Sequence, residues 1–286
     1  MSLRNQSVAI IGLGAMGHPI ATNIAKSGVS TQVWNRSTKE VAGATTLSPP
    51  QEVDAAIVLT VLPDLPDVEA VLAQGLEAAL KDGDVLVVMG TVSPVAVVAL
   101  GKRLVTKGIR VVDAPVSGGD VGAQNATLSI MVGASEVDFA DLLPTFKKIG
   151  STVLHLGPLG AGELAKACNQ IIVGATLTAL AEAVTLGRRA GLDTKVLLDI
   201  LAGGLAGSKA LDVKREKIES GNFAPGGLSE FQLKDLRFAL EAGADNRTAL
   251  PMTKEITELY EALVKNGDGK LDHSAIIKEI ERRSAN

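Results

Sequence analysis

The feature that most constrains the fold is a glycine-rich turn close to the start of the chain. Gly12-Leu13-Gly14-Ala15-Met16-Gly17 has the spacing G-x-G-x-x-G and follows directly on the apolar run at 7–11. At this spacing the first glycine permits a tight turn, the second lets a pyrophosphate approach the main chain, and the third lets a helix pack against a strand. The turn therefore predicts a βαβ unit that binds a dinucleotide, and not a glycine turn without a ligand.

The chain continues as an alternation of strand and helix patterns up to about residue 155. Short β-branched runs predict strands at 7–11, 31–34, 56–61, 84–89 and 110–113, with a last strand at 151–156. Segments with apolar residues at three- and four-residue intervals predict helices at 19–27, 66–80 and 94–107. This alternation is typical of an α/β domain with a parallel sheet, the Rossmann arrangement.

Helical patterns take over after the glycine-rich turn at 157–162. Residues 163–189 contain no proline and predict one helix, roughly 40 Å long at 1.5 Å per residue. Its uncharged middle needs more cover than a small helical domain supplies, so we expect a homodimer or homotetramer. Further helices are predicted at 194–201, 209–220, 229–242, 251–266 and 274–283. We expect a Rossmann domain at 1–162 and an all-helical substrate and oligomerisation domain at 163–286.

Composition excludes several classes of protein. Of the 286 residues, 46% are hydrophobic and 21% charged, which excludes disorder, and a net charge of −4 without a basic block argues against a nucleic-acid or membrane surface. One cysteine and three scattered histidines form no disulfide and predict no metal site, so we expect a cytoplasmic protein with a small-molecule partner. Glycines interrupt the apolar run at 8–15, against a secretory signal, and the apolar stretch 171–181 is too short to cross a bilayer.

The residues after the second predicted strand bear on the choice of dinucleotide. A free ribose 2′-hydroxyl is usually held by a carboxylate about 20 residues beyond the glycines. Here the segment 35–39 reads Asn-Arg-Ser-Thr-Lys, and no carboxylate occurs before Glu40. Asn35, Arg36 and Ser37 instead suit a 2′-phosphate, which predicts NADPH in preference to NADH. The alternative is that Arg36 stands in a solvated loop.

Ligands of α/β sheets lie at the carboxyl ends of the strands, so the residues just after each strand are candidates for binding. Leu62 and Pro63 follow the strand at 56–61, and Thr91 follows the strand at 84–89. The segment Asp-Ala-Pro-Val-Ser-Gly-Gly at 113–119 offers the Ser117 hydroxyl and unhindered N–H groups near Gly118 and Gly119. Such a turn suits a carboxylate, although the same residues could form only a tight turn.

A lysine stands near the start of the long predicted helix. Lys166, Asn169 and Gln170 are spaced i, i+3 and i+4, so they share one face. The next four turns carry almost no charge, and an amine in apolar surroundings gives up its charge more readily than one in water. Lys166 is therefore a candidate proton donor, with Asn169 and Gln170 beside it. In the alternative, Lys166 reaches from the helix terminus into solvent.

Four motifs in this order resemble the β-hydroxyacid dehydrogenase family over essentially the whole chain. They are the glycine turn 12–17 with Asn23, the segment 113–119, the pattern G-x-x-G-x-G-x-x-x-K-x-x-N at 157–169, and Lys-Asp-Leu at 234–236. Within the family the chain is most similar to the tartronate semialdehyde reductases. That similarity rests on Lys-Ala-Cys-Asn-Gln at 166–170, Gly-Gly-Leu-Ala-Gly-Ser at 203–208 and Asp-His-Ser-Ala at 272–275.

The resemblance implies roles for several residues. Lys166 would be the general acid or base, Asn169 its orienting partner, and the turn 117–119 the substrate carboxylate site. Thr91 would meet the nicotinamide ribose, and Lys234 would line the nicotinamide site.

The chain departs from the family pattern at two places. Val88 and Gly90 stand where members often have Asp and Ser. Gln170 replaces a second asparagine of many members, as it does in the tartronate semialdehyde reductases.

We read the chain as an NADPH-dependent reductase of small carboxylate-bearing aldehydes, most like tartronate semialdehyde reductase. Related alternatives are a 3-hydroxyisobutyrate dehydrogenase, a glyoxylate or succinic semialdehyde reductase, and an imine reductase. A different class is a dinucleotide-binding scaffold without turnover, and Lys166 with Asn169 argue against it because a scaffold needs no proton donor.

Overall fold

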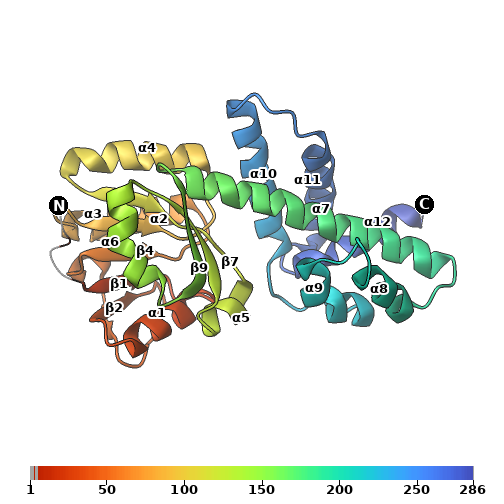
Figure 1. Ribbon diagram of the computed structural model, residues 1–286, viewed down its shortest axis with the longest axis horizontal. Helices are drawn as coiled ribbons and strands as arrows, with labels where there is room; N and C mark the ends of the chain where they lie inside the picture. The colour runs from red at the N-terminus through yellow and green to blue at the C-terminus, as the bar shows by residue number, and fades with distance from the viewer. Residues whose placement is uncertain (1–2, 4–5, 286) are drawn as a thin grey trace. The chain divides into compact units, whose positions relative to one another are not determined.

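The computed structural model describes residue 3 and residues 6–285, and the chain divides into two compact units (Figure 1). The first unit is Met1–Lys166 and contains the sheet, and the second is Ala167–Asn286 and is helical. This confirms the predicted fold class, an α/β dinucleotide-binding domain followed by an all-α domain that begins on one long helix. The predicted boundary between 162 and 163 lies four residues before this division.

The sheet of the first unit has the strand order β3-β2-β1-β4-β5-β6-β8-β7, with β9 beside β8. The first six strands in that order are parallel, and they reproduce the order 3-2-1-4-5-6 of doubly wound dinucleotide-binding folds. The order reverses between β1 and β4, which is where such folds bind their ligand. The strands are β1 Val8–Ile11, β2 Thr31–Trp34, β3 Thr45–Thr46, β4 Ile57–Thr60, β5 Val85–Val88, β6 Arg110–Asp113, β7 Val116–Ser117, β8 Leu128–Gly133 and β9 Gly150–Gly157.

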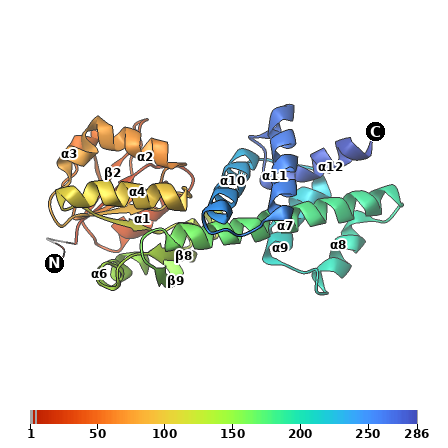
Figure 2. The same cartoon turned by 90° about the horizontal axis from the view of Figure 1, so that it is seen from above.

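Alternate strand residues build two cores, one on each face of the sheet. Val8 and Ile10 pack with α1 and α6, whereas Ala9 and Ile11 pack with α2 and α4. Because both faces are covered, the central strands are continuous apolar runs without polar alternation. Figure 2 shows α2, α3 and α4 along one face. The helices are α1 Gly17–Lys26, α2 Leu65–Val71, α3 Glu77–Ala79, α4 Pro94–Leu104, α5 Gly119–Gln124 and α6 Glu136–Phe146, with a π-helical turn at Leu72–Leu76.

The region 114–149 differs from the sequence-based prediction. It contains β7, α5, β8 and α6, none of which we predicted, and β8 runs antiparallel to β6 and β7. The sheet is therefore parallel over its first six strands, as predicted, and mixed at this edge. The chain reverses at Gly118 and Gly119, where φ is +127° and +64°, and the short α5 is no full crossover between parallel strands. The two-residue strand β3 was also missed.

The second unit packs around α7, Ala161–Arg189, whose first residues belong to the first unit. Its core includes the fully buried Val184, Leu198, Leu236 and Tyr260. The remaining helices are α8 Thr194–Ala202, α9 Lys209–Ser220, α10 Ser229–Asp245, α11 Pro251–Leu263 and α12 Ile276–Ser284, with a π-helical turn at Val264–Asp268 and a 3-10 turn at His273–Ala275.

Helix α7 corrects one expectation. In residues 3 and 6–285 it is the one helix whose 29 residues are long and apolar enough, by length and composition alone, to cross a membrane. The stretch 171–181 is thus part of a longer helix, whose length alone would be sufficient to cross a bilayer. Half of the residues in its most apolar window are nevertheless buried inside the protein, as in the core helix of a globular domain.

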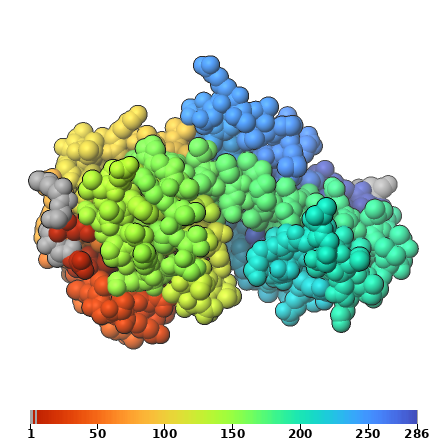
Figure 3. All heavy atoms as spheres, viewed as in Figure 1, coloured from red at the N-terminus to blue at the C-terminus, as the bar shows by residue number. Residues whose placement is uncertain are grey.

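Several apolar side chains of α7 and α8 are exposed. Ile172 and Leu186 on α7 are 64% and 71% exposed, and Ile200 on α8 is 71% exposed. The space-filling view shows α7 open to the viewer along much of its length (Figure 3). Cover by a second subunit stays a prediction.

Candidate active site

The glycine-rich turn has the geometry that its spacing predicts. Gly12 has φ of +101°, and a Cβ there would lie 2.6 Å from the Val61 oxygen. A Cβ on Gly17, where α1 starts, would lie 1.8 Å from the Gly12 oxygen, whereas one on Gly14 would meet nothing within 4 Å. Gly12 and Gly17 are thus required by the packing of the chain, and Gly14 leaves the main chain open to a ligand. Leu13 is buried, Ala15 exposed and Met16 half-buried.

One of the predicted cofactor-selecting residues, Asn35, lies against this turn. Asn35 Oδ1 accepts a hydrogen bond from the Leu13 N–H at 2.8 Å, and Asn35 Nδ2 donates to the Ser37 main-chain oxygen at 2.8 Å. Lys39 Nζ donates to the Leu13 oxygen at 2.9 Å. Arg36 is exposed. The structure therefore brings Asn35 and Lys39 to the turn, while Ser37 contacts Asn35.

The loops after β4 and β5 touch each other. A Cβ on Gly90 would lie 1.9 Å from the Leu62 oxygen, so only glycine fits there. The departure from the family pattern at Gly90 is thus a packing requirement. Leu62, Pro63 and Thr91 follow the carboxyl ends of β4 and β5, and all three are at least partly exposed.

Lys166 lies beside the turn predicted to hold a carboxylate. Its side chain is buried, and its Nζ atom donates a hydrogen bond to the Val116 oxygen at 2.9 Å. Ser117 follows Val116 directly, and Gly118 and Gly119 have positive φ values, a conformation that most side chains do not adopt. The first unit therefore brings the candidate proton donor and the candidate anion turn together. The alternative in which Lys166 reaches into solvent is wrong.

Two buried carboxylates that we did not assign hold the first turn of α7. Asp113, at the end of β6, accepts hydrogen bonds from the N–H groups of Gly160 and Glu163, each at 2.7 Å. Burial raises the pKa of the Asp113 carboxyl to about 6, and the hydrogen bonds from the main chain oppose this rise. The Glu163 carboxylate accepts from the Val92 N–H at 3.1 Å. Both acids lie within the quoted motifs, but no local pattern shows that they face main-chain donors.

The second unit joins the other predicted site residues in a polar cluster. Asn169 Nδ2 donates to Gln170 Oε1 at 2.8 Å, and Gln170 Nε2 donates to Asp235 Oδ2 at 2.7 Å. Asp235 also forms an ion pair with Lys234 at 3.0 Å. Lys234 Nζ lies 4.8 Å from the ring centre of Phe238. Gln232, which sequence reasoning missed, donates to the Gln170 oxygen at 3.1 Å and fixes α10 against α7.

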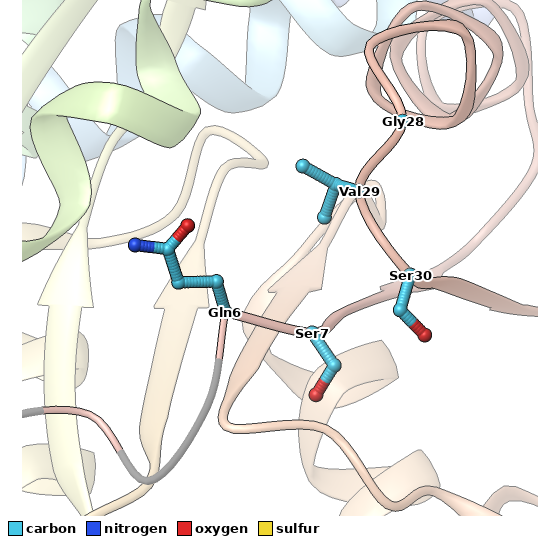
Figure 4. Close-up of a pocket in the computed structure, with 5 residues that line it drawn as sticks. All are labelled: Gln6, Ser7, Gly28, Val29 and Ser30. Carbon is cyan, nitrogen blue, oxygen red and sulfur yellow. The ribbon is translucent and has the colours of Figure 1, made fainter.

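A hollow of about 350 Å³ lies at the opposite edge of the sheet (Figure 4). It is lined by Gln6, Ser7, Gly28, Val29 and Ser30, at the amino ends of β1 and β2. These five residues carry no titratable side chain, and the glycine turn, Ser117 and Lys166 lie elsewhere. We therefore place the candidate site at the carboxyl ends of the strands. Among residues 3 and 6–285, no group of three His, Cys, Asp or Glu could hold a metal ion.

Two known protein families match the two parts of the chain. Residues 7–157 match the family described as the NAD binding domain of 6-phosphogluconate dehydrogenase. Residues 160–280 match the family described as NAD-binding of NADP-dependent 3-hydroxyisobutyrate dehydrogenase. The fold and these matches define an NAD(P)-dependent oxidoreductase that acts on CH–OH groups.

Individual relatives extend over nearly the whole chain. The 2-(hydroxymethyl)glutarate dehydrogenase of Eubacterium barkeri is 41% identical over 285 residues, which cover 96% of this chain and 95% of that protein. The 2-hydroxy-3-oxopropionate reductase of Escherichia coli K12 is 35% identical, with 96% and 97% covered. The crystal structure of 3-hydroxyisobutyrate dehydrogenase from Salmonella typhimurium superposes with a TM-score of 0.87 at 26% identity, with 96% and 99% covered. The chain belongs to the β-hydroxyacid dehydrogenase family.

Proposed function

We propose that the protein is an NADPH-dependent reductase of small 3-oxo acids, with 2-hydroxy-3-oxopropionate (tartronate semialdehyde) as its substrate. The observation that carries the proposal is the hydrogen bond from Lys166 Nζ to the Val116 oxygen, at 2.9 Å. It holds a buried amine one residue from the Ser117-Gly118-Gly119 turn. A proton donor and a carboxylate site this close together suit an aldehyde that carries a nearby carboxylate.

The glycine turn fits a dinucleotide. A side chain at Gly14 would stand in open space, so its absence leaves the main chain free for a pyrophosphate, with the start of α1 beside it. When bound, the nicotinamide supplies the hydride that reduces the aldehyde carbon.

This chain's own residues complete the reaction. Lys166 would donate a proton from Nζ to the carbonyl oxygen as that oxygen gains negative charge, and the product is a hydroxy acid. The Ser117 hydroxyl and the nearby N–H groups would hold the carboxylate and fix the approach of the carbonyl carbon. Asn169, three residues beyond Lys166 on α7, would orient the amine.

The preference for NADPH rests on the loop after β2. The exposed Arg36 follows Asn35, whose side chain is fixed to the glycine turn by the 2.8 Å bond to the Leu13 N–H. A guanidinium at this place would pair with a ribose 2′-phosphate by charge-assisted hydrogen bonds. The segment 35–39 contains no carboxylate that would bind the free ribose 2′-hydroxyl of NADH.

A second candidate substrate is 2-formylglutarate, the aldehyde that corresponds to 2-(hydroxymethyl)glutarate. This candidate is supported by the 41% identity of the chain to the Eubacterium barkeri enzyme, compared with 35% to the Escherichia coli reductase. Both candidates are 3-oxo acids, so the same Lys166 and Ser117 chemistry applies to each. They differ in that 2-formylglutarate carries a second carboxylate.

The test compares aldehyde acids with matching neutral aldehydes at fixed NADPH. We expect kcat/KM to be higher by roughly 10-fold to 100-fold for tartronate semialdehyde than for glycolaldehyde, and for succinic semialdehyde than for butyraldehyde, because the neutral compound leaves the hydrogen-bond donors of the 117–119 turn without a carboxylate partner. Equal values within each pair would remove the carboxylate from the proposal, and a preference for cyclic imines would make the protein an imine reductase. Oxidation of glycerate and of 2-(hydroxymethyl)glutarate with NADP⁺ then separates the two candidate substrates.

A further inference from the structure

The carboxylate of Asp113 is enclosed by the start of α7. It is fully buried, and its two oxygens receive different donors, Oδ1 from the Gly160 N–H and Oδ2 from the Glu163 N–H, both at 2.7 Å. The first N–H groups of a helix lack partners within the helix, and a carboxylate is their most effective acceptor. Asp113 therefore caps α7 from a residue 47 positions earlier in the chain.

The surrounding glycines make room for this carboxylate. A Cβ on Gly133 would lie 2.1 Å from Asp113 Oδ1. A Cβ on Gly162 would lie 2.2 Å from the Met131 oxygen and 2.9 Å from Asp113 Oδ2. The last glycine of the motif at 157–162 is therefore needed for the close approach of α7 to β8 and to the Asp113 carboxylate.

A second carboxylate joins the same turn to another strand end. Glu163 is buried, and its Oε2 atom accepts a hydrogen bond from the Val92 N–H, in the loop after β5. The first turn of α7 is thus attached to the end of β6 through Asp113 and to the end of β5 through Glu163. Lys166 stands three residues beyond Glu163, and its amine bonds to Val116, three residues beyond Asp113.

We propose that Asp113 and Glu163 are positioning residues, which fix the first turn of α7 so that the Lys166 amine stays at the Val116 oxygen beside the Ser117-Gly118-Gly119 turn. This inference rests on the proposed function, because it gives Lys166 the role of proton donor. The competing explanation is that both acids only stabilise the fold. The two explanations predict different coupling to Lys166.

The decisive experiment is a double-mutant cycle of Asp113→Asn and Lys166→Ala in the full chain. In Asp113→Asn one N–H of the helix start faces an amide NH₂ group instead of an oxygen, and we expect kcat to fall by roughly 10-fold to 100-fold. In the Lys166→Ala background the same substitution should change the residual kcat by less than about 2-fold, because residues that act as a unit are non-additive. The Kd for NADPH should stay within about 2-fold, since the glycine turn is untouched.

Asp84 offers a matched control at the other edge of the sheet. It too is a buried aspartate that accepts a main-chain N–H, from Lys81 at 2.9 Å, just before β5. Asp84→Asn should lower Tm as Asp113→Asn does. Any effect of Asp84→Asn on kcat should be equal in the parent and Lys166→Ala backgrounds.

Each outcome decides a different claim. Near-parental kcat in Lys166→Ala contradicts the proposed function itself. Suppose instead that Lys166→Ala loses most of its activity. If Asp113→Asn then lowers kcat by the same factor in the parent and in Lys166→Ala, or does not lower it in the parent, only the positioning role is overturned. If Asp113→Asn does not accumulate as folded protein, Glu163→Ala enters the same cycle, because alanine keeps the helix and removes the acceptor of the Val92 N–H. Additivity there also overturns the inference.

Discussion

The Nζ atom of Lys166 donates to the main-chain oxygen of Val116 at 2.9 Å. The donor lies on α7, and the acceptor lies 50 residues earlier in β7, directly before Ser117. The bond fixes a long, flexible side chain that would otherwise sample many rotamers. One short segment therefore both positions the amine and forms the turn proposed to hold a carboxylate.

Removal of the amine tests its chemical role. Lys166→Ala should fold and bind NADPH, yet lose reduction by about 10²-fold to 10⁴-fold, the usual scale of general acid catalysis. Steady-state kcat with a semialdehyde and NADPH measures this loss, and fluorescence titration measures NADPH binding. Lys102→Ala, which removes an exposed lysine on α4, is the control and should keep full activity. Near-normal kcat in Lys166→Ala at neutral pH would make Lys166 a packing residue.

Cofactor preference should follow the loop after β2. We expect the unaltered enzyme to prefer NADPH and Asn35→Asp to reverse that preference. Aspartate keeps an oxygen for the Leu13 N–H, adds an acceptor for a 2′-hydroxyl, and repels a 2′-phosphate. The ratio of kcat/KM for NADPH to that for NADH measures the change.

Arg36→Ala is the companion variant for this prediction. It should lower kcat/KM for NADPH by roughly 10-fold to 150-fold, the equivalent of a charged hydrogen bond worth about 1.5 to 3 kcal/mol, and leave NADH unchanged. Equal or better kcat/KM with NADH in the unaltered enzyme would contradict the preference.

The parts of the fold that local patterns determine were predicted closely from sequence. The strands at 31–34 and 110–113 and the helix at 209–220 have the predicted bounds. Each combines a clear period with a nearby glycine of positive φ: Gly28 before β2 (+81°), Gly108 before β6 (+73°) and Gly221 after α9 (+70°). Such signals lie within a few residues, so no tertiary information is needed.

What escaped prediction depends on partners far along the chain. Strand β8 is defined by its pairing with β9, about 22 residues later, and with β7, which lies just before the reversal of the chain at Gly118. The Asp113 carboxylate acquires its role only when Gly160 and Glu163 fold over it. Lys166 and Ser117 could be chosen as candidates because helical spacing and the strand-end rule act locally, whereas the contacts of Asp113 and Glu163 with the start of α7 have no local pattern.

The buried Asp113 also predicts how stability depends on pH. Its pKa is raised from 3.8 to about 6 in the folded protein, chiefly by burial. An acid with a raised pKa binds its proton more tightly when the chain is folded, so its contribution to stability is greatest below about pH 4 and is lost as pH rises to about 6. The lost free energy is of order 3 kcal/mol, from about two pKa units at 1.36 kcal/mol each.

Asp113→Asn isolates this contribution, because asparagine does not titrate. The Tm of the parent minus that of the variant should be larger at pH 4.5 than at pH 7, while the effects of all other carboxyl groups cancel in the difference. Differential scanning calorimetry at the two pH values gives the comparison. A difference that is constant, or that grows toward pH 7, would show that Asp113 does not titrate with a raised pKa.

Subunit assembly should depend on the exposed apolar face of α7 and α8. Ile200 and Leu186 are each 71% exposed, and the two helices are in contact, since a Cβ on Gly187 would lie 2.6 Å from the Leu197 side chain. Isolated apolar side chains on a surface are ordinary, but a group of them on neighbouring helices marks an interface. We therefore expect a homodimer or homotetramer at micromolar concentration. Ile200→Glu should dissociate it, because a charge buried without a partner is costly.

Light scattering coupled to size-exclusion chromatography measures the mass of parent and variant. Val105→Glu is the matched control, because Val105 is 63% exposed but lies in the first unit, at the end of α4. It should leave the mass unchanged, and both variants should keep the circular dichroism of the parent. A parent that is monomeric at micromolar concentration would show that α7 needs no second subunit. An oligomer that tolerates both Ile200→Glu and Leu186→Glu would place the interface on another surface.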